Sequence, residues 1–272
     1  MDRRYLSELA PRTRTSGLWR LPYTAPKTQN PKPKTQDPRP KTQDPKPERL
    51  PMSTSRRLRA LADPIWTAQH THPLVRGIGD GTLAPAVFAV WLRQDYLFLV
   101  EYARVFAFAA ARAPDLATMR RLASLLTETL ETEMDLHRAY VAEFGITEAD
   151  LLAEVMLPTT RSYTDFLVRH AAASDFAVVL AALLPCMWGY AELGQRLATA
   201  GGSTEPRYAR WVDMYAGQDF ANLVAWCRDL LDDHTQHVSP AVERQLEDAF
   251  LTSSRYELAF WQMAWSGETW ST

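Results

Sequence analysis

Apolar side chains recur at helical spacing over most of the chain from about Ser53 onward. Leu58, Leu61, Ile65 and Trp66 begin the pattern. Longer runs of the same kind cover 85–113, 116–144, 163–173, 176–200, 205–215, 221–234 and 240–265. Apolar residues three or four positions apart share one face of an α-helix, and strand-like alternation is missing. The pattern therefore predicts an all-α protein.

Helix ends are also visible in the sequence. Pro114, Gly145 and the pair Gly201-Gly202 should stop the runs that precede them. The pair Ser174-Asp175 is a typical N-cap for the run over 176–200. Several runs are apolar on more than one face, which indicates helices packed inside a compact bundle.

The first 51 residues differ from the rest. A seven-residue unit, Lys27-Thr-Gln-Asn-Pro-Lys-Pro33, is followed by near copies at 34–40 and 41–47, and ten of the 18 prolines lie before residue 52. The repeat has no apolar side chains to bury, so we expect a disordered, basic, Pro-rich tail over 1–51 and a helical domain over 52–272. The tail could be a docking segment or a dispensable extension, and Met52 could be the start of translation.

Charge separates the same two segments. The first 51 residues carry twelve Lys/Arg and five Asp/Glu, which leaves 18 basic and 27 acidic residues of the chain's 30 and 32 for the remainder. An acidic domain with no basic helix argues against a nucleic-acid partner. No apolar run is long enough for a membrane span. Two cysteines, Cys186 and Cys227, do not make a disulfide framework, so a cytoplasmic location is expected.

Cys186 is the first candidate for chemistry. It lies in Leu183-Leu-Pro-Cys-Met-Trp-Gly-Tyr190, where Pro185 removes a helical hydrogen bond and should bend the helix locally. Tyr190, four residues on, shares its face. A thiol becomes a nucleophile only when a neighbour helps to ionise it. None is adjacent in sequence, so a small core residue remains the alternative.

Two carboxylates stand among apolar residues. Asp95 precedes Tyr-Leu-Phe-Leu, and Glu257 lies in Tyr256-Glu-Leu-Ala-Phe-Trp-Gln-Met-Ala-Trp265. A buried carboxylate is costly unless it is paired, and its pKa tends to move into the range that suits acid–base catalysis. A solvated helix edge or a structural hydrogen bond is the alternative.

Glu133 and His137 lie four residues apart on one helix face. A di-iron bundle site needs Glu-x-x-His at a spacing of three, repeated on a second helix, so a metal site is disfavoured and a histidine–carboxylate hydrogen bond is expected. Aromatic residues near these positions would suit a flat heteroaromatic ligand if some of them line a cavity. They are Tyr96, Phe98, Tyr102, Tyr163, Trp188, Tyr190, Tyr215, Phe260 and Trp261.

Six segments between about Ile65 and Trp270 together resemble the TenA/thiaminase II family, and they occur in the same order as in that family. They are the stretch from His72 to Leu83, which reads as a first loop and the start of the second helix, then Gln94–Leu99, Glu131–His137, Leu183–Tyr190, Trp211–Gly217 and Tyr256–Ala264. The resemblance implies a haem-oxygenase-like all-α fold without haem, metal or other cofactor.

The resemblance also implies the roles of individual residues. Cys186 falls on the family's nucleophile, Glu257 on the carboxylate that moves protons at a ring nitrogen, and Asp95 on the carboxylate that binds the ring amino group and assists the cysteine. Tyr163, Tyr190, Tyr215 and Phe260 fall on the pocket wall. Phe98 stands where some relatives have a pocket tyrosine, which removes a hydrogen bond worth about 0.5–1.5 kcal/mol and leaves the preferred leaving group open.

The expected activity is that of an aminopyrimidine aminohydrolase (thiaminase II) in thiamin salvage. It hydrolyses 4-amino-5-aminomethyl-2-methylpyrimidine to the hydroxymethyl pyrimidine and ammonia, with weaker cleavage of thiamin. The partner is thus a small-molecule pyrimidine, and the family implies a homotetramer. A regulatory pyrimidine-binding protein that does not need Cys186, and a metal-dependent oxygenase on the same fold, are the alternatives.

Overall fold

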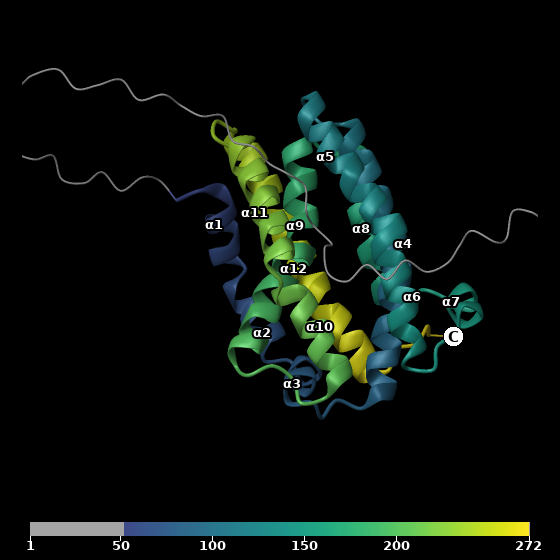
Figure 1. Cartoon of the computed structure of the whole chain (residues 1–272). Helices are drawn as coiled ribbons and strands as arrows, with labels where there is room; N and C mark the ends of the chain where they lie inside the picture. Colours follow the sequence, from purple (N-terminus) through teal and green to yellow (C-terminus); the bar gives the residue numbers. More distant parts are fainter. Residues whose placement is uncertain (1–51, 272) are drawn as a thin grey trace, which may run out of the picture. The chain divides into compact units, whose positions relative to one another are not determined.

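The computed structural model describes residues 52–271, except for the side chains of Thr132, Glu133 and Leu136. Within 52–271 the chain forms twelve α-helices, one π-helical segment and no strand (Figure 1). The predicted all-α class is therefore confirmed. The tail predicted over 1–51 lies outside the described residues.

The helices follow one another with short connections. They are α1 (Thr54–Leu61), α2 (Asp63–His70), α3 (Pro73–Asp80), α4 (Pro85–Ala111), α5 (Leu116–Thr127), η1 (Glu128–Glu133), α6 (Met134–Ala142), α7 (Glu148–Ala153), α8 (Pro158–Ala173), α9 (Phe176–Thr199), α10 (Pro206–Ala216), α11 (Gln218–Asp233) and α12 (Pro240–Ser266). Proline stands in the first turn of α2, α3, α4, α8, α10 and α12, where its missing amide hydrogen costs nothing.

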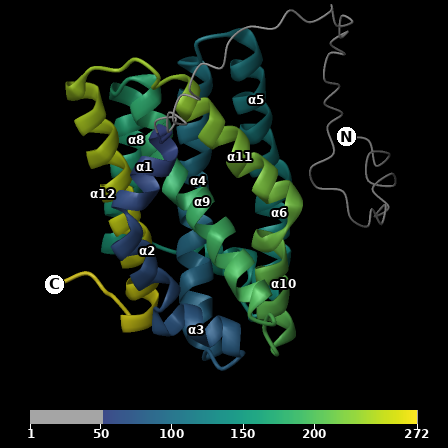
Figure 2. The ribbon, with the colours of Figure 1, turned by 90° about the vertical axis from the view of Figure 1, so that its left-hand side faces the viewer.

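Helix α9 is the centre of the bundle. It packs against α12, α10 and α11, and it also contacts α8 and α4 (Figure 2). It runs unbroken through Pro185, and 15 of its 24 residues are buried. The expectation that no apolar run is long enough for a membrane span is wrong for α9, which passes by length and composition. However, 78% of its apolar window is buried within the bundle, as is usual for the core helix of a globular domain.

Helix α4 forms the second inner layer. It is 27 residues long and packs against α5 and α8 on different sides, with further contacts to α12 (Figure 1). Aromatic residues therefore face inward at several heights of α4, among them Phe88, Trp91, Phe98 and Tyr102. The inner faces of α4, α8, α9, α10 and α12 together form the core into which the predicted site residues point.

Three segments differ from the sequence expectations. The run over 116–144 is not one helix, because the π-helical η1 separates α5 from α6. The stretch read as a first loop, from His72, contains the helix α3, which begins at Pro73 and is capped by the His72 side chain. Helix α7 was not predicted; its capping box, in which Thr147 and Asp150 bond each other's backbone, stabilises a helix of only six residues.

Candidate active site

Five helices bring the predicted site residues together. Helix α4 supplies Asp95 and Phe98, α8 supplies Tyr163, α9 supplies Cys186 and Tyr190, α10 supplies Tyr215, and α12 supplies Glu257 and Phe260. Asp95 and Glu257 are 8% and 3% exposed, so neither is the solvated helix edge that composition alone favoured. Cys186 is partly accessible, whereas Cys227 is buried.

The thiol of Cys186 and the carboxyl of Glu257 are hydrogen-bonded to each other. Glu257 is also held by the Tyr163 hydroxyl, which donates to its Oε1 at 2.5 Å. The Tyr163 hydroxyl oxygen lies 2.9 Å from the Ser253 hydroxyl. A thiol, a carboxyl and two hydroxyls therefore form one connected chain of hydrogen bonds, in which all groups except the thiol are buried.

The pKa of Glu257 suits proton transfer near neutral pH. Burial raises it from 4.5 to about 7, and the bonds from Tyr163 and Cys186 oppose that rise. Burial, then the neighbouring Glu257 and Cys186, raise the pKa of Tyr163 well above its usual value, so Tyr163 stays a proton donor. A carboxyl that is half ionised near pH 7 can both accept and return a proton during turnover.

Asp95 of α4 lies close to His137 of α6. His137 donates from Nε2 to the Leu92 carbonyl oxygen at 2.9 Å, and its Nδ1 lies 3.6 Å from Asp95 Oδ2. Burial lowers the pKa of His137 to about 4, so the ring is neutral at pH 7 and the contact with Asp95 is not an ion pair. His137 Nε2 thus bonds to a backbone carbonyl, and the histidine–carboxylate hydrogen bond expected with Glu133 stays a prediction. The Glu133 side chain lies outside the described residues.

Aromatic rings enclose this group. Phe98 lies 5.1 Å from Tyr163 and 5.9 Å from Phe260, measured between ring centroids. Tyr190 lies 4.9 Å from Tyr215. Burial, and then the charges of Glu257 and Asp95, raise the pKa of Tyr190 well above its usual value, so Tyr190 lies within electrostatic reach of both carboxylates.

A layer of tryptophans lies behind the tyrosines. Trp91 of α4 and Trp261 of α12 stack with ring centroids 5.5 Å apart and planes inclined by 7°. Tyr190 packs on Trp261 at 5.3 Å, and Trp211 of α10 meets Trp91 edge-on. The site therefore has a rigid aromatic wall on one side and an acid–thiol group on the other, an arrangement that suits a flat ligand with an electron-poor ring.

Comparisons with known proteins show the family to which the chain belongs. The model of the TENA/THI-4/PQQC family matches residues 59–267. The chain belongs to this family. An "Aminopyrimidine aminohydrolase" of Halalkalibacterium halodurans is 40% identical over 221 residues, which is 81% of this chain and 99% of that protein. One of Bacillus subtilis is 37% identical over 220 residues, 81% of this chain and 93% of that protein.

Solved structures of TenA proteins share the fold. A "TenA homologue protein from P.horikoshii OT3" superposes with a TM-score of 0.75 at 28% identity, covering 79% of this chain and all of that one. A Shewanella denitrificans domain with a heme oxygenase-like fold superposes at 0.60 and 16% identity, over 78% of this chain and 90% of that one, and bears on the fold alone. The haem-oxygenase-like fold expected from the TenA resemblance is confirmed.

One close helix contact positions Tyr215, a candidate site residue of this TenA chain. Gly194 of α9 lies against the backbone of α10, and a Cβ there would come within 2.7 Å of the Tyr215 carbonyl carbon and 2.8 Å of the Ala216 nitrogen. Helix α10 can therefore approach α9 closely only because residue 194 has no side chain.

We expect Gly194→Ala to push α10 away from α9, lower the free energy of unfolding by about 1–3 kcal/mol and raise KM through displacement of Tyr215. Gly189→Ala on the same helix is the control, because a Cβ there meets only Gln69 Oε1 at 3.7 Å. Thermal unfolding and steady-state kinetics of the two variants give the comparison. Equal behaviour would contradict the role of Gly194.

The sequence did not single out Ser253, because this residue lies outside the six motifs and a serine within a helix has no distinctive pattern.

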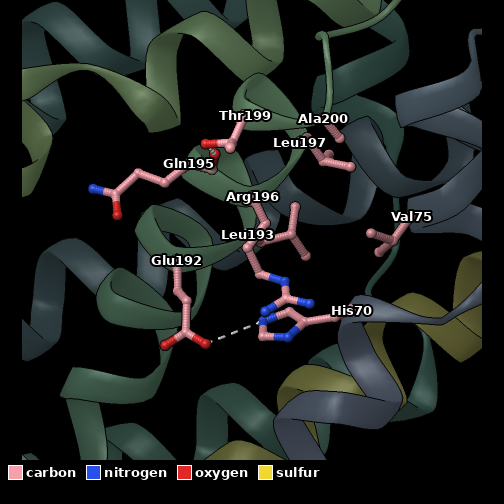
Figure 3. A pocket seen from close by; sticks show the side chains of 9 residues that line it. All are labelled: His70, Val75, Glu192, Leu193, Gln195, Arg196, Leu197, Thr199 and Ala200. Atoms are coloured by element: carbon pink, nitrogen blue, oxygen red, sulfur yellow. Dashed lines mark hydrogen bonds and ion pairs between the residues drawn. The ribbon is translucent and has the colours of Figure 1, made fainter.

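An open groove lies elsewhere, along the C-terminal part of α9, where His70 Nε2 is 3.7 Å from Glu192 Oε1 (Figure 3). None of the predicted site residues lines it. Among the side chains that are described, no three His, Cys, Asp or Glu residues gather as metal ligands.

Proposed function

We propose that this protein is an aminopyrimidine aminohydrolase of thiamin salvage. It hydrolyses the C–N bond at the aminomethyl group of 4-amino-5-aminomethyl-2-methylpyrimidine and releases the hydroxymethyl pyrimidine and ammonia. It cleaves thiamin more slowly. The observation that carries the proposal is the hydrogen bond between the Cys186 thiol and the buried Glu257 carboxyl, beside a wall of aromatic rings. The two relatives called aminopyrimidine aminohydrolase match 221 and 220 residues, in each case 81% of this chain.

The reaction begins at the thiol. Glu257 takes the thiol proton, the sulfur of Cys186 forms a bond to a carbon of the pyrimidine ring, and the proton passes from Glu257 to a ring nitrogen. The aminomethyl group enters the reaction as ammonium, so electrons of the resulting ring expel it from the exocyclic methylene as neutral ammonia, and the water that adds later releases the balancing proton. Splitting one displacement into addition and elimination lowers each barrier.

Water completes the cycle. It adds to the methylene carbon, a ring nitrogen returns its proton to Glu257, and the C–S bond breaks to restore Cys186. The net change is exchange of an amino group for a hydroxyl, so no oxidant or reductant is consumed. Glu257 acts in both directions, which is what a pKa near the working pH allows.

The remaining residues hold the ring in place. Asp95 accepts a hydrogen bond from the ring amino group, and Tyr190 and Tyr215 stack on or bond to the pyrimidine. Tyr163, Phe98 and Phe260 close the opposite wall.

The test is ammonia release from the aminomethyl pyrimidine by the purified full-length protein, with thiamin as a parallel substrate. We expect a higher kcat/KM for the aminomethyl pyrimidine. Comparable or greater activity on thiamin would contradict the salvage assignment. Tight binding of the pyrimidine without release of any product would instead identify a pyrimidine-binding protein.

We further propose that the enzyme is a homotetramer. Apolar residues at alternating spacings of three and four follow the outer side of α5 into η1: Leu116, Met119, Ala123, Leu126 and Leu130. Of these, Leu116, Met119 and Leu130 are exposed. A continuous stripe with this spacing is typical of a helix that packs on another helix.

Light scattering after size-exclusion chromatography should give about four times the chain mass of 30.8 kDa. The double variant Leu116→Glu/Leu130→Glu should give a smaller species, because charges in an apolar interface remain unpaired. A wild-type monomer would contradict the proposal. We also propose a cytoplasmic location, because the Cys186 thiol must stay reduced to act as a nucleophile.

A further inference from the structure

Two adjacent serines on α12 have different partners although both are fully buried. Ser254 accepts a hydrogen bond from the Trp66 indole nitrogen at 3.0 Å, and its carbonyl oxygen accepts one from Gln69. Ser253 instead lies 2.9 Å from the Tyr163 hydroxyl. Ser253 is also one helical turn before Glu257, so the two side chains share a face of α12.

The direction of the hydrogen bonds around Tyr163 follows from counting protons. A tyrosine hydroxyl has one proton, and at 2.5 Å from Glu257 Oε1 that proton lies between Tyr163 and the carboxylate. When Glu257 is ionised, the Tyr163 oxygen can therefore only accept from Ser253. The chain of donors runs from Ser253 through Tyr163 to Glu257, and the Cys186 thiol reaches Glu257 separately.

We propose that Ser253 is a positioning residue of this enzyme. By donating to the Tyr163 hydroxyl, it turns the proton of that hydroxyl toward Glu257 and so keeps the carboxylate free to accept the thiol proton of Cys186. The inference rests on the role of Glu257 in the proposed function. Ser253 does not touch the reacting atoms; it acts through Tyr163.

Removal of Ser253 has a defined electrostatic effect. A hydroxyl that accepts a hydrogen bond is a stronger donor, so the loss of Ser253 weakens the bond from Tyr163 to Glu257. That bond lowers the pKa of Glu257 against the effect of burial. Without Ser253 the carboxyl therefore protonates at higher pH, and the active form of the enzyme is lost there.

Glu257 has two side-chain hydrogen-bond donors, the Tyr163 hydroxyl and the Cys186 thiol. Helix α9 contributes Cys186 and Tyr190, and α8 contributes Tyr163. Helix α4 contributes Asp95, whose charge acts on Tyr190. Helix α2 contributes the neutral side chains of Trp66 and Gln69, which bond to Ser254. The pH dependence of Glu257 should thus respond to Ser253 and not to Ser254.

The experiment compares Ser253→Ala with Ser254→Ala, two neighbouring serines of equal burial. For each, kcat/KM is measured against pH, and thermal unfolding is followed. We expect the acid limb of Ser253→Ala to move up by about half a pH unit or more, roughly a threefold loss of kcat/KM well below pH 7. Its value at high pH should stay near that of wild type. Ser254→Ala should melt at lower temperature with the limb unmoved.

Ser253→Thr and Ser253→Val form a second pair, because their side chains have nearly equal volume and only threonine has a hydroxyl. Ser253→Thr should keep the acid limb of wild type, whereas Ser253→Val should shift the limb as Ser253→Ala does. The pH dependence of Cys186 alkylation by iodoacetamide, in a Cys227→Ala background, reports the same proton equilibrium without turnover. An unmoved limb in both Ser253→Ala and Ser253→Val, or an equal shift in Ser254→Ala, would overturn the inference.

The two proposals can fail separately. If Glu257→Gln turned over the pyrimidine at the wild-type rate, the proposed function of Glu257 would be wrong. The alkylation profiles of the serine variants would still decide the role of Ser253. If Glu257→Gln is inactive and the alkylation profile of Ser253→Ala matches that of wild type, only the inference on Ser253 is wrong.

Discussion

Replacing Cys186 with alanine is expected to lower kcat/KM for the aminomethyl pyrimidine by about 10³-fold or more, which corresponds to about 4 kcal/mol of lost transition-state stabilisation. The variant has no sulfur to add to the ring, so the expulsion of ammonia would have to proceed without a covalent intermediate. Binding should persist, because the aromatic wall of Tyr190 and Trp261 is intact. Stopped ammonia release with retained heat of ligand binding in calorimetry is the expected pair of results.

Cys227→Ala is the matched control for this variant. Cys227 is a buried thiol whose sulfur atom lies 3.9 Å from that of Met187, and burial raises its pKa to about 12. It should therefore remain a small apolar core residue, and its loss should cost about 1 kcal/mol of stability with little effect on turnover. A Cys186→Ala enzyme that keeps more than a tenth of wild-type activity would exclude covalent catalysis by that thiol.

Glu257→Gln is expected to reduce kcat/KM by about 10²–10⁴-fold, the range for loss of a general acid–base group. The amide keeps the shape and can still accept from Tyr163, but it cannot take up or return a proton. In wild type, the pKa of about 7 means that the carboxylate form is lost as pH falls, so kcat/KM should drop tenfold per pH unit below 7. In the variant this acid limb should be absent.

Glu257→Gln should lower activity but should not lower the stability of the folded protein. The pKa of Glu257 is higher in the folded protein than its ordinary value of 4.5, so its protonated form contributes stability below pH 4.5, and this contribution is lost as pH rises through about 7. The interval corresponds to up to about 3 kcal/mol. Glutamine is neutral throughout, so Glu257→Gln should melt at or above the wild-type temperature at pH 8.

Glu247→Gln controls for the loss of one negative charge on α12. Glu247 forms a partly exposed ion pair with Arg57, which is worth no more than about 1 kcal/mol. The activity and the pH profile of this variant should match those of wild type. A Glu257→Gln enzyme that is inactive and also strongly destabilised at pH 8 would contradict a role of Glu257 in proton transfer, because the defect would then be structural.

The elements that the sequence predicts well are those whose apolar pattern reflects burial. The run over 176–200 became α9 almost to the residue, because its side chains are buried nearly all around. The run over 116–144 also predicted helix, but periodicity cannot distinguish one extra residue in a π-turn from a regular turn, so η1 was missed. Helix α7 is too short to show a period, and its capping box was the only available signal.

The candidate site follows the same division. The motifs that contain Cys186, Glu257 and Asp95 pointed to these residues as candidates. The resemblance that rests on the same motifs also pointed to the aromatic residues around them. The hydrogen bond between Tyr163 and Glu257 joins residues 94 positions apart on two different helices. The sequence of each helix alone does not show how far apart the two helices lie. Ser253 could not be found for a related reason: the difference between Ser253 and Ser254 arises only from which neighbouring helix each one faces.

The stacked indoles of Trp91 and Trp261 also give the site an optical signal. Trp211 and Tyr190 pack on these rings, so the indoles lie next to a candidate site residue. An electron-poor pyrimidine that stacks nearby accepts an electron from an excited indole, so its arrival should quench the intrinsic fluorescence of the protein. Occupancy of the pocket can then be followed in variants that have lost all chemistry, without a label and without a coupled assay.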